Sequence, residues 1–274
     1  MIELEDTFGD IVRKAANGNG LAPGAVAQSA GADPKRLADF IADAARPTED
    51  EARAIARALR LDPGKLADIG LRRWRPADMK PDDRYGHQIN TPHPSNGYFL
   101  MLKDQKAAAF VDPGGNQSNI IATLRRSPAR LDYILVTHKH PDHIDALPDV
   151  HQAFPGARVA VHRADQPALG AEGATALSVA DGDALPFGDG EIRIVHTPGH
   201  TDGSICFIYK SSIFTGDTLF AGSVGGVFGD NFGYQDLIAS ATTKIFSLPD
   251  DVVVLPGHGP PSTIREERAH NPFF

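Results

Sequence analysis

The chain of 274 residues is long enough for one large domain, or for a large domain with a smaller one. Hydrophobic residues make up 41% and charged residues 23%, which is the balance of a globular protein, and no run of about 18 apolar residues predicts a membrane-spanning helix. The single cysteine, Cys206, excludes an internal disulfide, and the acidic start lacks a signal peptide's basic head and apolar core. We therefore expect a cytoplasmic protein without a membrane partner.

The net charge of −8 belongs entirely to the C-terminal part of the chain. Residues 1–75 contain 12 basic and 12 acidic side chains, whereas residues 76–274 contain 15 basic and 23 acidic ones. Because nucleic-acid phosphates are attracted by a basic surface, the acidic part is not expected to act on nucleic acid.

The N-terminal part carries a helical pattern, in which alanine and leucine recur at helical spacing. Within it, residues 21–40 fit a helix-turn-helix. Gly31 would make the turn, and Leu37 and Phe40 would anchor the second helix. We expect this small all-α domain to span residues 1–72.

Residues 7–70 as a whole resemble the Cro/CI-like DNA-binding fold. The resemblance implies that the second helix of the motif would enter the major groove from its N-terminal end. That end offers Lys35 and Arg36 as DNA contacts, beside the acidic Asp33. Because the region is neutral overall, counterion release gives it little drive to bind DNA. DNA binding, dimerisation and packing on the rest of the chain are therefore the alternatives.

From about Tyr98 the pattern changes to short apolar or β-branched runs separated by Gly, Pro and Asp, which is typical of strands. The expected strands are residues 98–102, 107–112, 133–137, 157–162, 191–196, 205–210, 212–216 and 251–256. Helices are expected near residues 117–126, 144–154 and 236–246. We expect a linker at residues 73–82 and an α/β domain over residues 83–274.

The densest cluster of potential metal ligands directly follows one of these strands. His138 and His140 come first, and two residues apart they point the same way in an extended chain. Asp142 and His143 follow a proline, where the chain turns and can aim both side chains at a neighbouring point. Imidazole and carboxylate ligands suit Zn(II), Fe(II) or Mn(II). One histidine alone would indicate only a polar loop, but four candidate ligands within six residues predict a metal site.

Three more candidate ligands occupy the same kind of position, in a glycine-containing turn just after an apolar strand: His200, Asp217 and His258. Loops that leave one edge of a sheet converge there, so we expect these side chains to join the cluster. Three other histidines are expected at structural or surface positions: His151, His162 and His196.

The pattern His-x-His-x-Asp-His followed by a distant His, Asp and His resembles the metallo-β-lactamase superfamily over residues 83–274. Asp217 stands where the true β-lactamases carry cysteine, and with VDPGGN, TPGHTDGS and FTGDTLFAGSVG this resembles the short glyoxalase II-like hydrolases. The resemblance implies an αββα sandwich and two divalent ions, Zn(II) first, with Fe(II) or Mn(II) as alternatives. The implied ligands are His138, His140 and His200 for the first ion, Asp142, His143 and His258 for the second, and Asp217 as the bridge.

This resemblance further implies hydrolysis of a thioester of the hydroxyacylglutathione type, or of a small acyl ester, by a hydroxide held between the two ions. A thiolate leaves readily, so a thioester needs no strong general acid. Asp142 is the expected proton acceptor. The expected pocket residues are Phe220, Phe228 and Tyr234, although these rings would also suit ordinary packing.

Other functions stay open on the same pattern. A persulfide dioxygenase would use a single iron, and the complete second set of ligands favours the hydrolase over it. A lactonase is a further alternative. An alternative of another class is a DNA-binding regulator whose hydrolase domain senses or clears a metabolite. The expected partners are thus a small thioester or ester, DNA at the N-terminal domain, and a second copy of the chain in a homodimer.

Overall fold

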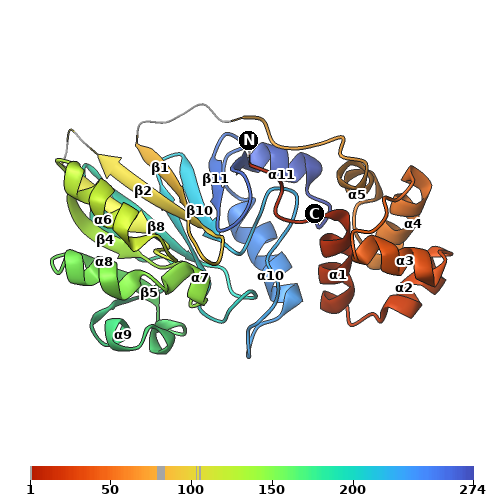
Figure 1. Ribbon diagram of the computed structural model, residues 1–274, viewed down its shortest axis with the longest axis horizontal. Helices are drawn as coiled ribbons and strands as arrows, with labels where there is room; N and C mark the ends of the chain where they lie inside the picture. The colour runs from red at the N-terminus through yellow and green to blue at the C-terminus, as the bar shows by residue number, and fades with distance from the viewer. Residues whose placement is uncertain (1, 79–83, 103, 105) are drawn as a thin grey trace.

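The computed structural model describes residues 2–78, 84–102, 104 and 106–274, and in them two six-stranded sheets lie face to face (Figure 1). Helices cover the outer face of each sheet, which gives the expected αββα sandwich, and a group of five N-terminal helices lies at one end. None of the helices in these residues is long and apolar enough to cross a bilayer.

The first sheet has the strand order β1 to β6, antiparallel from β1 to β3 and parallel from β3 to β6. Its strands are β1 (Tyr85–Ile89), β2 (Asn96–Leu102), β3 (Ala107–Val111), β4 (Arg130–Leu135), β5 (Arg158–His162) and β6 (Leu177–Val179). The helices between them are α6 (Gln117–Arg126), α7 (Pro141–Ile144), α8 (Leu147–Ala153), the 3₁₀ helix η2 (Gln166–Leu169) and α9 (Ala171–Thr175).

The second sheet has the order β12 to β7 and is antiparallel except where β10 pairs with β11. Its strands are β7 (Ala184–Phe187), β8 (Gly190–His196), β9 (Ile205–Tyr209), β10 (Ser212–Gly216), β11 (Val253–Pro256) and β12 (Ser262–Thr263). Two helices accompany it: α10 (Tyr234–Ser240), continued by the π-helical turn η3 (Ala241–Ile245), and α11 (Ile264–His270).

Alternation along the strands separates the core into layers. In β2, Tyr98, Leu100 and Leu102 point into the space between the sheets, whereas Phe99 points to the layer of α6 and α8. The period of two therefore explains why an almost wholly apolar strand is buried on both faces. Strands β1, β6, β7 and β12 carried too weak an apolar pattern to be expected from the sequence.

The N-terminal helices are α1 (Phe8–Gly18), α2 (Pro23–Ala30), α3 (Pro34–Ile41), α4 (Glu49–Leu59) and α5 (Pro63–Gly70). Helices α2 and α3 are joined by a short turn at Gly31, whose φ of +62° is a left-handed conformation that favours glycine. Leu37 and Phe40 are each 1% exposed, so the expected turn and anchors are confirmed. Helix starts are capped by side chains such as Asp33 and Thr48.

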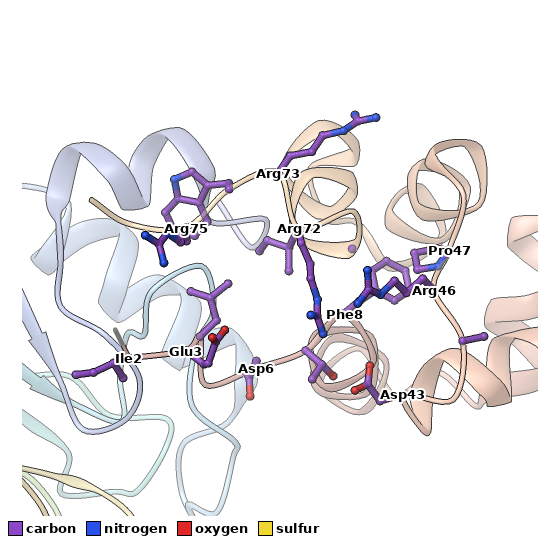
Figure 2. Close-up of a pocket in the computed structure, with 16 residues that line it drawn as sticks. Ile2, Glu3, Asp6, Phe8, Asp43, Arg46, Pro47, Arg72, Arg73 and Arg75 are labelled. Carbon is purple, nitrogen blue, oxygen red and sulfur yellow. The ribbon is translucent and has the colours of Figure 1, made fainter. Parts of the chain in front are cut away.

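These helices share one hydrophobic core with the second sheet. Val12 and Ala16 of α1 belong to the same buried cluster as Leu219 and Leu237. The expected linker, residues 73–82, lies partly outside the described residues. Near the chain that leaves α5, a cavity of about 350 Å³ remains at the junction of the two parts, where the close-up shows basic and acidic side chains together (Figure 2).

Candidate metal centre

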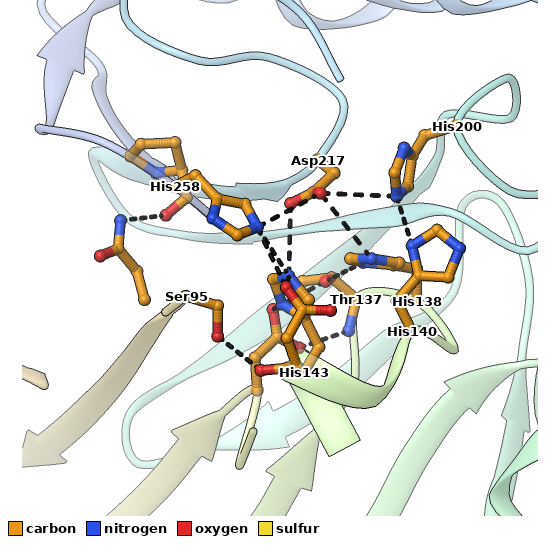
Figure 3. A network of polar contacts seen from close by, with 12 residues as sticks. Ser95, Thr137, His138, His140, His143, His200, Asp217 and His258 are labelled. Atoms are coloured by element: carbon orange, nitrogen blue, oxygen red, sulfur yellow. Dashed lines mark hydrogen bonds and ion pairs between the residues drawn. The ribbon is translucent and has the colours of Figure 1, made fainter. Parts of the chain in front are cut away.

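All seven candidate ligands lie together at one edge of the two sheets (Figure 3). Each comes from a loop that follows a strand: the first four after β4, and the others after β8, β10 and β11. His140 has extended backbone angles, φ −68° and ψ 146°, and Pro141 then starts α7. The extended segment and the turn after it are what the spacing predicted.

The first group of ligand atoms comes from His138, His140 and His200. His200 Nε2 lies 2.9 Å from His140 Nδ1, and it lies 3.5 Å from Oδ2 of Asp217. His138 Nε2 is 4.0 Å from the same oxygen. Three imidazole nitrogens and one carboxylate oxygen therefore surround a single point.

The second group comes from Asp142, His143 and His258. Asp142 Oδ2 lies 3.4 Å from His143 Nε2 and 3.2 Å from His258 Nε2, and the two nitrogens are 3.4 Å apart. Asp217 Oδ1 is 3.4 Å from His143 Nε2. Asp217 thus presents one oxygen to each side, which is the geometry of a shared ligand.

The chemistry of these donors fits two divalent ions. Ligands at about 2.0–2.1 Å from a tetrahedral zinc ion are about 3.3 Å apart, close to most of the separations in both groups. In addition, His138 Nε2 and Asp217 Oδ1 are buried without a hydrogen-bond partner in the described part of the chain. Buried polar atoms are rarely left unpaired, so these two atoms indicate a missing cation.

Four of the five histidines have a second contact that fixes the ring from outside. His143 Nδ1 lies 3.0 Å from Oδ2 of Asp112, which also accepts a hydrogen bond from Thr137 Oγ1. His200 Nδ1 donates to the Gly226 carbonyl at 2.7 Å. His138 Nδ1 lies 3.1 Å from Thr137 Oγ1. Such partners set the tautomer and raise the basicity of the ligand nitrogen.

The fifth outer contact comes from the N-terminal segment, where Glu5 Oε1 is 3.8 Å from His258 Nδ1. Sequence reasoning missed both Glu5 and Asp112. Asp112 had a usable signal, because it follows the apolar strand β3 and precedes Pro-Gly, as the ligand loops do. Glu5 had none, since it lies outside every strand-turn pattern.

Burial and neighbouring charges prepare the histidines differently. Burial lowers the pKa of His138 well below its ordinary value, and it lowers that of His200 to about 4. Burial opposes the charge of Asp217, but the surrounding histidines, His258 and His143 first, hold its pKa well below the usual range. The centre therefore combines neutral imidazoles with a charged carboxylate, the forms that bind a metal.

The three histidines expected elsewhere lie outside the two ligand groups. His151 pairs with Glu172. His162 stacks on His196, with ring centroids 4.0 Å apart, and burial followed by the charge of His196 lowers the pKa of His162 to about 4.

The predicted pocket residues are in different situations. Phe228 is 64% exposed and meets the rings of His140 and His200 edge-on, while Tyr234 lines the same cavity as Phe228. Phe220, in contrast, is buried against His258 and lies outside that lining, so its side chain packs beneath the centre.

The predicted DNA contacts lie at the start of α3, in the helical part. The Lys35 side chain is 84% exposed and pairs with Asp39. Arg36 forms two bonds with Glu51 and lies over the ring of Phe40. Both cations therefore already have acidic neighbours in their own helices.

Comparison with known proteins agrees with this architecture and cluster. Residues 90–258 match the sequence profile of the metallo-beta-lactamase superfamily, and the chain belongs to that superfamily. A hydroxyacylglutathione hydrolase of Haemophilus influenzae is 33% identical over 193 residues, which are 64% of this chain and 91% of that protein.

Two solved structures resemble the same part of the chain. The BLEG-1 B3 metallo-beta-lactamase is 31% identical with a TM-score of 0.61, over 69% of this chain and 98% of that one. A protein solved in a di-iron-bound form is 27% identical with a TM-score of 0.58, over 69% of this chain and 100% of that one.

Proposed function

We propose that the chain is a binuclear metal-dependent hydrolase that cleaves a thioester of the hydroxyacylglutathione type or a small acyl ester. The observation that carries this proposal is the convergence of two groups of ligand atoms on one carboxylate, Asp217. When bound, two divalent ions supply Lewis acidity and lower the pKa of a water molecule from about 16 to about 7. Similarity to a hydroxyacylglutathione hydrolase supports a thioester as the substrate class.

The proposed ligands of the first ion are His138, His140 and His200, those of the second are Asp142, His143 and His258, and Asp217 is shared. Zn(II) is the proposed metal, because imidazole and carboxylate donors at these separations suit it. Fe(II), supported by the di-iron-bound relative, and Mn(II) are the alternatives. Metal analysis of purified protein should give two equivalents.

Asp142 is the proposed proton acceptor. Its side chain is 25% exposed, whereas that of Asp217 is 9% exposed, so Asp142 is the cluster carboxylate nearer to solvent. Burial raises the pKa of Asp142, but hydrogen bonds with His143 and His258 outweigh this and lower it, which keeps the group ionised. A thiolate leaving group needs no further acid.

Thiol release from S-lactoylglutathione and from acyl-CoA thioesters tests the proposal, with protein first stripped by a chelator and then reloaded with zinc. Release that is lost on stripping and restored by zinc supports a thioesterase. Absence of release from protein that contains two metals would contradict it. Lactone hydrolysis or oxygen consumption with glutathione persulfide would then identify the lactonase or the persulfide dioxygenase; two ligand sets favour the hydrolase.

We also infer a division into a Cro/CI-like helix-turn-helix domain (residues 1–72), a linker (73–82) and a catalytic domain (83–274). Because Arg36 is engaged by Glu51 and Lys35 by Asp39, we expect the helical domain to make protein contacts, in cis or in a homodimer, more readily than DNA contacts. A mobility-shift assay on DNA upstream of its own gene tests this. Binding that is lost when Lys35 and Arg36 are replaced would instead support the regulator.

A further inference from the structure

A cavity of about 520 Å³ lies between α1 and the loop after β10, beside the metal centre. On the loop side it is lined by residues 225–228 and Tyr234, which offer only glycine and apolar or aromatic surface. On the other side it is lined by Arg13, Lys14, Asn17 and Gly18 of α1. The cationic groups of its wall therefore come from the helical part, outside the stretch that matches the superfamily.

The loop side of this cavity is continuous with the metal centre. The exposed ring of Phe228 lies 5.2 Å from the ring of His140 and 5.6 Å from that of His200, measured between centroids. The Gly226 carbonyl accepts the hydrogen bond from His200 Nδ1. A ligand that lies across Phe228 can therefore reach the cluster with one end and the cavity with the other.

The spacing of the α1 residues places them on one face of the helix, since positions i and i+4 are neighbours. Gly18 lets α1 approach closely, because a Cβ there would come within 2.3 Å of the Tyr234 ring. Lys14 is committed to this packing, with its Nζ bound to Asp6 and to the Val224 carbonyl. It therefore holds the helix in place and has little capacity left for a ligand.

Arg13 differs from Lys14, because its side chain is 51% exposed and its pairing is with Asp10 on its own helix. An exposed pair of this kind contributes little and is readily exchanged for another anion. Asn17, one turn further on, is also exposed and offers an amide donor. None of the described residues that line the cavity is acidic, so nothing in its wall repels an anion.

We infer that α1 forms the specificity wall of the substrate pocket, where Arg13, assisted by Asn17, binds a carboxylate on the thiol-carrier end of the thioester. This inference rests on the proposed function and deepens it, because it selects an anionic thiol carrier over a neutral one. A guanidinium binds a carboxylate through two parallel hydrogen bonds, so the site fixes the orientation of the carrier while the carbonyl lies at the cluster.

Steady-state kinetics of the full chain test this with three thioesters: S-lactoylglutathione, acetyl-CoA and the uncharged S-acetyl-N-acetylcysteamine. We expect Arg13→Gln to raise KM for S-lactoylglutathione about tenfold, to leave kcat within about twofold, and to leave the neutral thioester unaffected. Arg57→Gln on α4 is the matched control, an exposed arginine away from the cavity. Arg13→Lys should recover part of the affinity.

A rise in KM for acetyl-CoA as well would support an anion site that also accepts phosphate. An equal rise for the neutral thioester, or no rise for any substrate, would overturn the inference.

Calorimetric binding of S-methylglutathione, which cannot be hydrolysed, separates this inference from the proposed function. If the protein cleaves no thioester, the proposed function fails, yet weaker binding by Arg13→Gln than by the unmodified chain still supports the α1 site. Equal binding by both, or no binding by either, overturns it.

Discussion

Replacement of Asp112 by Asn should weaken the second metal site without removing any of its ligands. Asp112 Oδ1 accepts the amide hydrogen bond of Thr137 at 2.8 Å, and Oδ2 accepts from Thr137 Oγ1 at 2.7 Å while lying 3.0 Å from His143 Nδ1. Asparagine keeps one acceptor oxygen and replaces the other with a donor. Its amide can satisfy the Thr137 backbone or His143, but not both.

The size of the effect follows from the bond that is lost. A hydrogen bond to a charged group is worth about 1.5–3 kcal/mol, and each 1.4 kcal/mol is about a tenfold change in an equilibrium constant. Metal affinity at the site that uses His143 should therefore fall about 10- to 100-fold, which is the usual range for partners of metal ligands. The first site should change less, because only Thr137 links Asp112 to His138.

Competition with a chromophoric chelator measures the two affinities, and metal analysis after dialysis measures the stoichiometry. Asp132→Asn is the matched control, since Asp132 lies on β4 and pairs with Arg130 away from the cluster. The reasoning is refuted if folded Asp112→Asn binds the second ion as tightly as the unmodified protein. An equal loss in Asp132→Asn would refute it as well.

Three further predictions concern other parts of the chain. Burial raises the pKa of Glu267 to about 7, so stability is fully present below pH 4.5 and is lost as the pH rises through 7; Glu267→Gln should remove that loss, on the order of 3 kcal/mol, in urea titrations at pH 5 and 8, and an unchanged pH dependence would contradict this. Glu5→Gln should weaken the second metal about two- to fivefold in the chelator assay, a small effect because the pair is partly exposed, and no change would exclude a role for Glu5. Gly18→Val should cost about 1–3 kcal/mol in thermal unfolding by displacing Tyr234, whereas Gly24→Ala, which meets nothing, should not destabilise.

The cluster was predictable because one local rule places every ligand. Each follows an apolar strand and precedes a glycine- or proline-containing turn, so adjacent strand ends bring distant residues together, as with His200 and Asp217. Asp112 obeys the same rule but was missed, because its carboxylate contacts a ligand and lies outside the ligand groups. From sequence alone these two roles look the same.

Contacts between the two parts of the chain could not be predicted. The approach of Gly18 to Tyr234, and that of Glu5 to His258, depends on surfaces that come together only after each part has folded. No periodicity or motif records such a match. The exposure of Phe228 and the burial of Phe220 had the same origin, since both are aromatic residues of one loop.

The contacts of the N-terminal helices also bear on the order in which the chain folds. The Asp62 amide donates to the Pro272 carbonyl at 2.8 Å, and Lys65 Nζ donates to the Phe274 carbonyl at 2.6 Å. Residues made early in synthesis thus wait for residues made some two hundred positions later. Because pairings so distant in sequence form slowly, the apolar face of α1 stays exposed on the ribosome until the last helix emerges. That face is therefore where a chaperone would be needed.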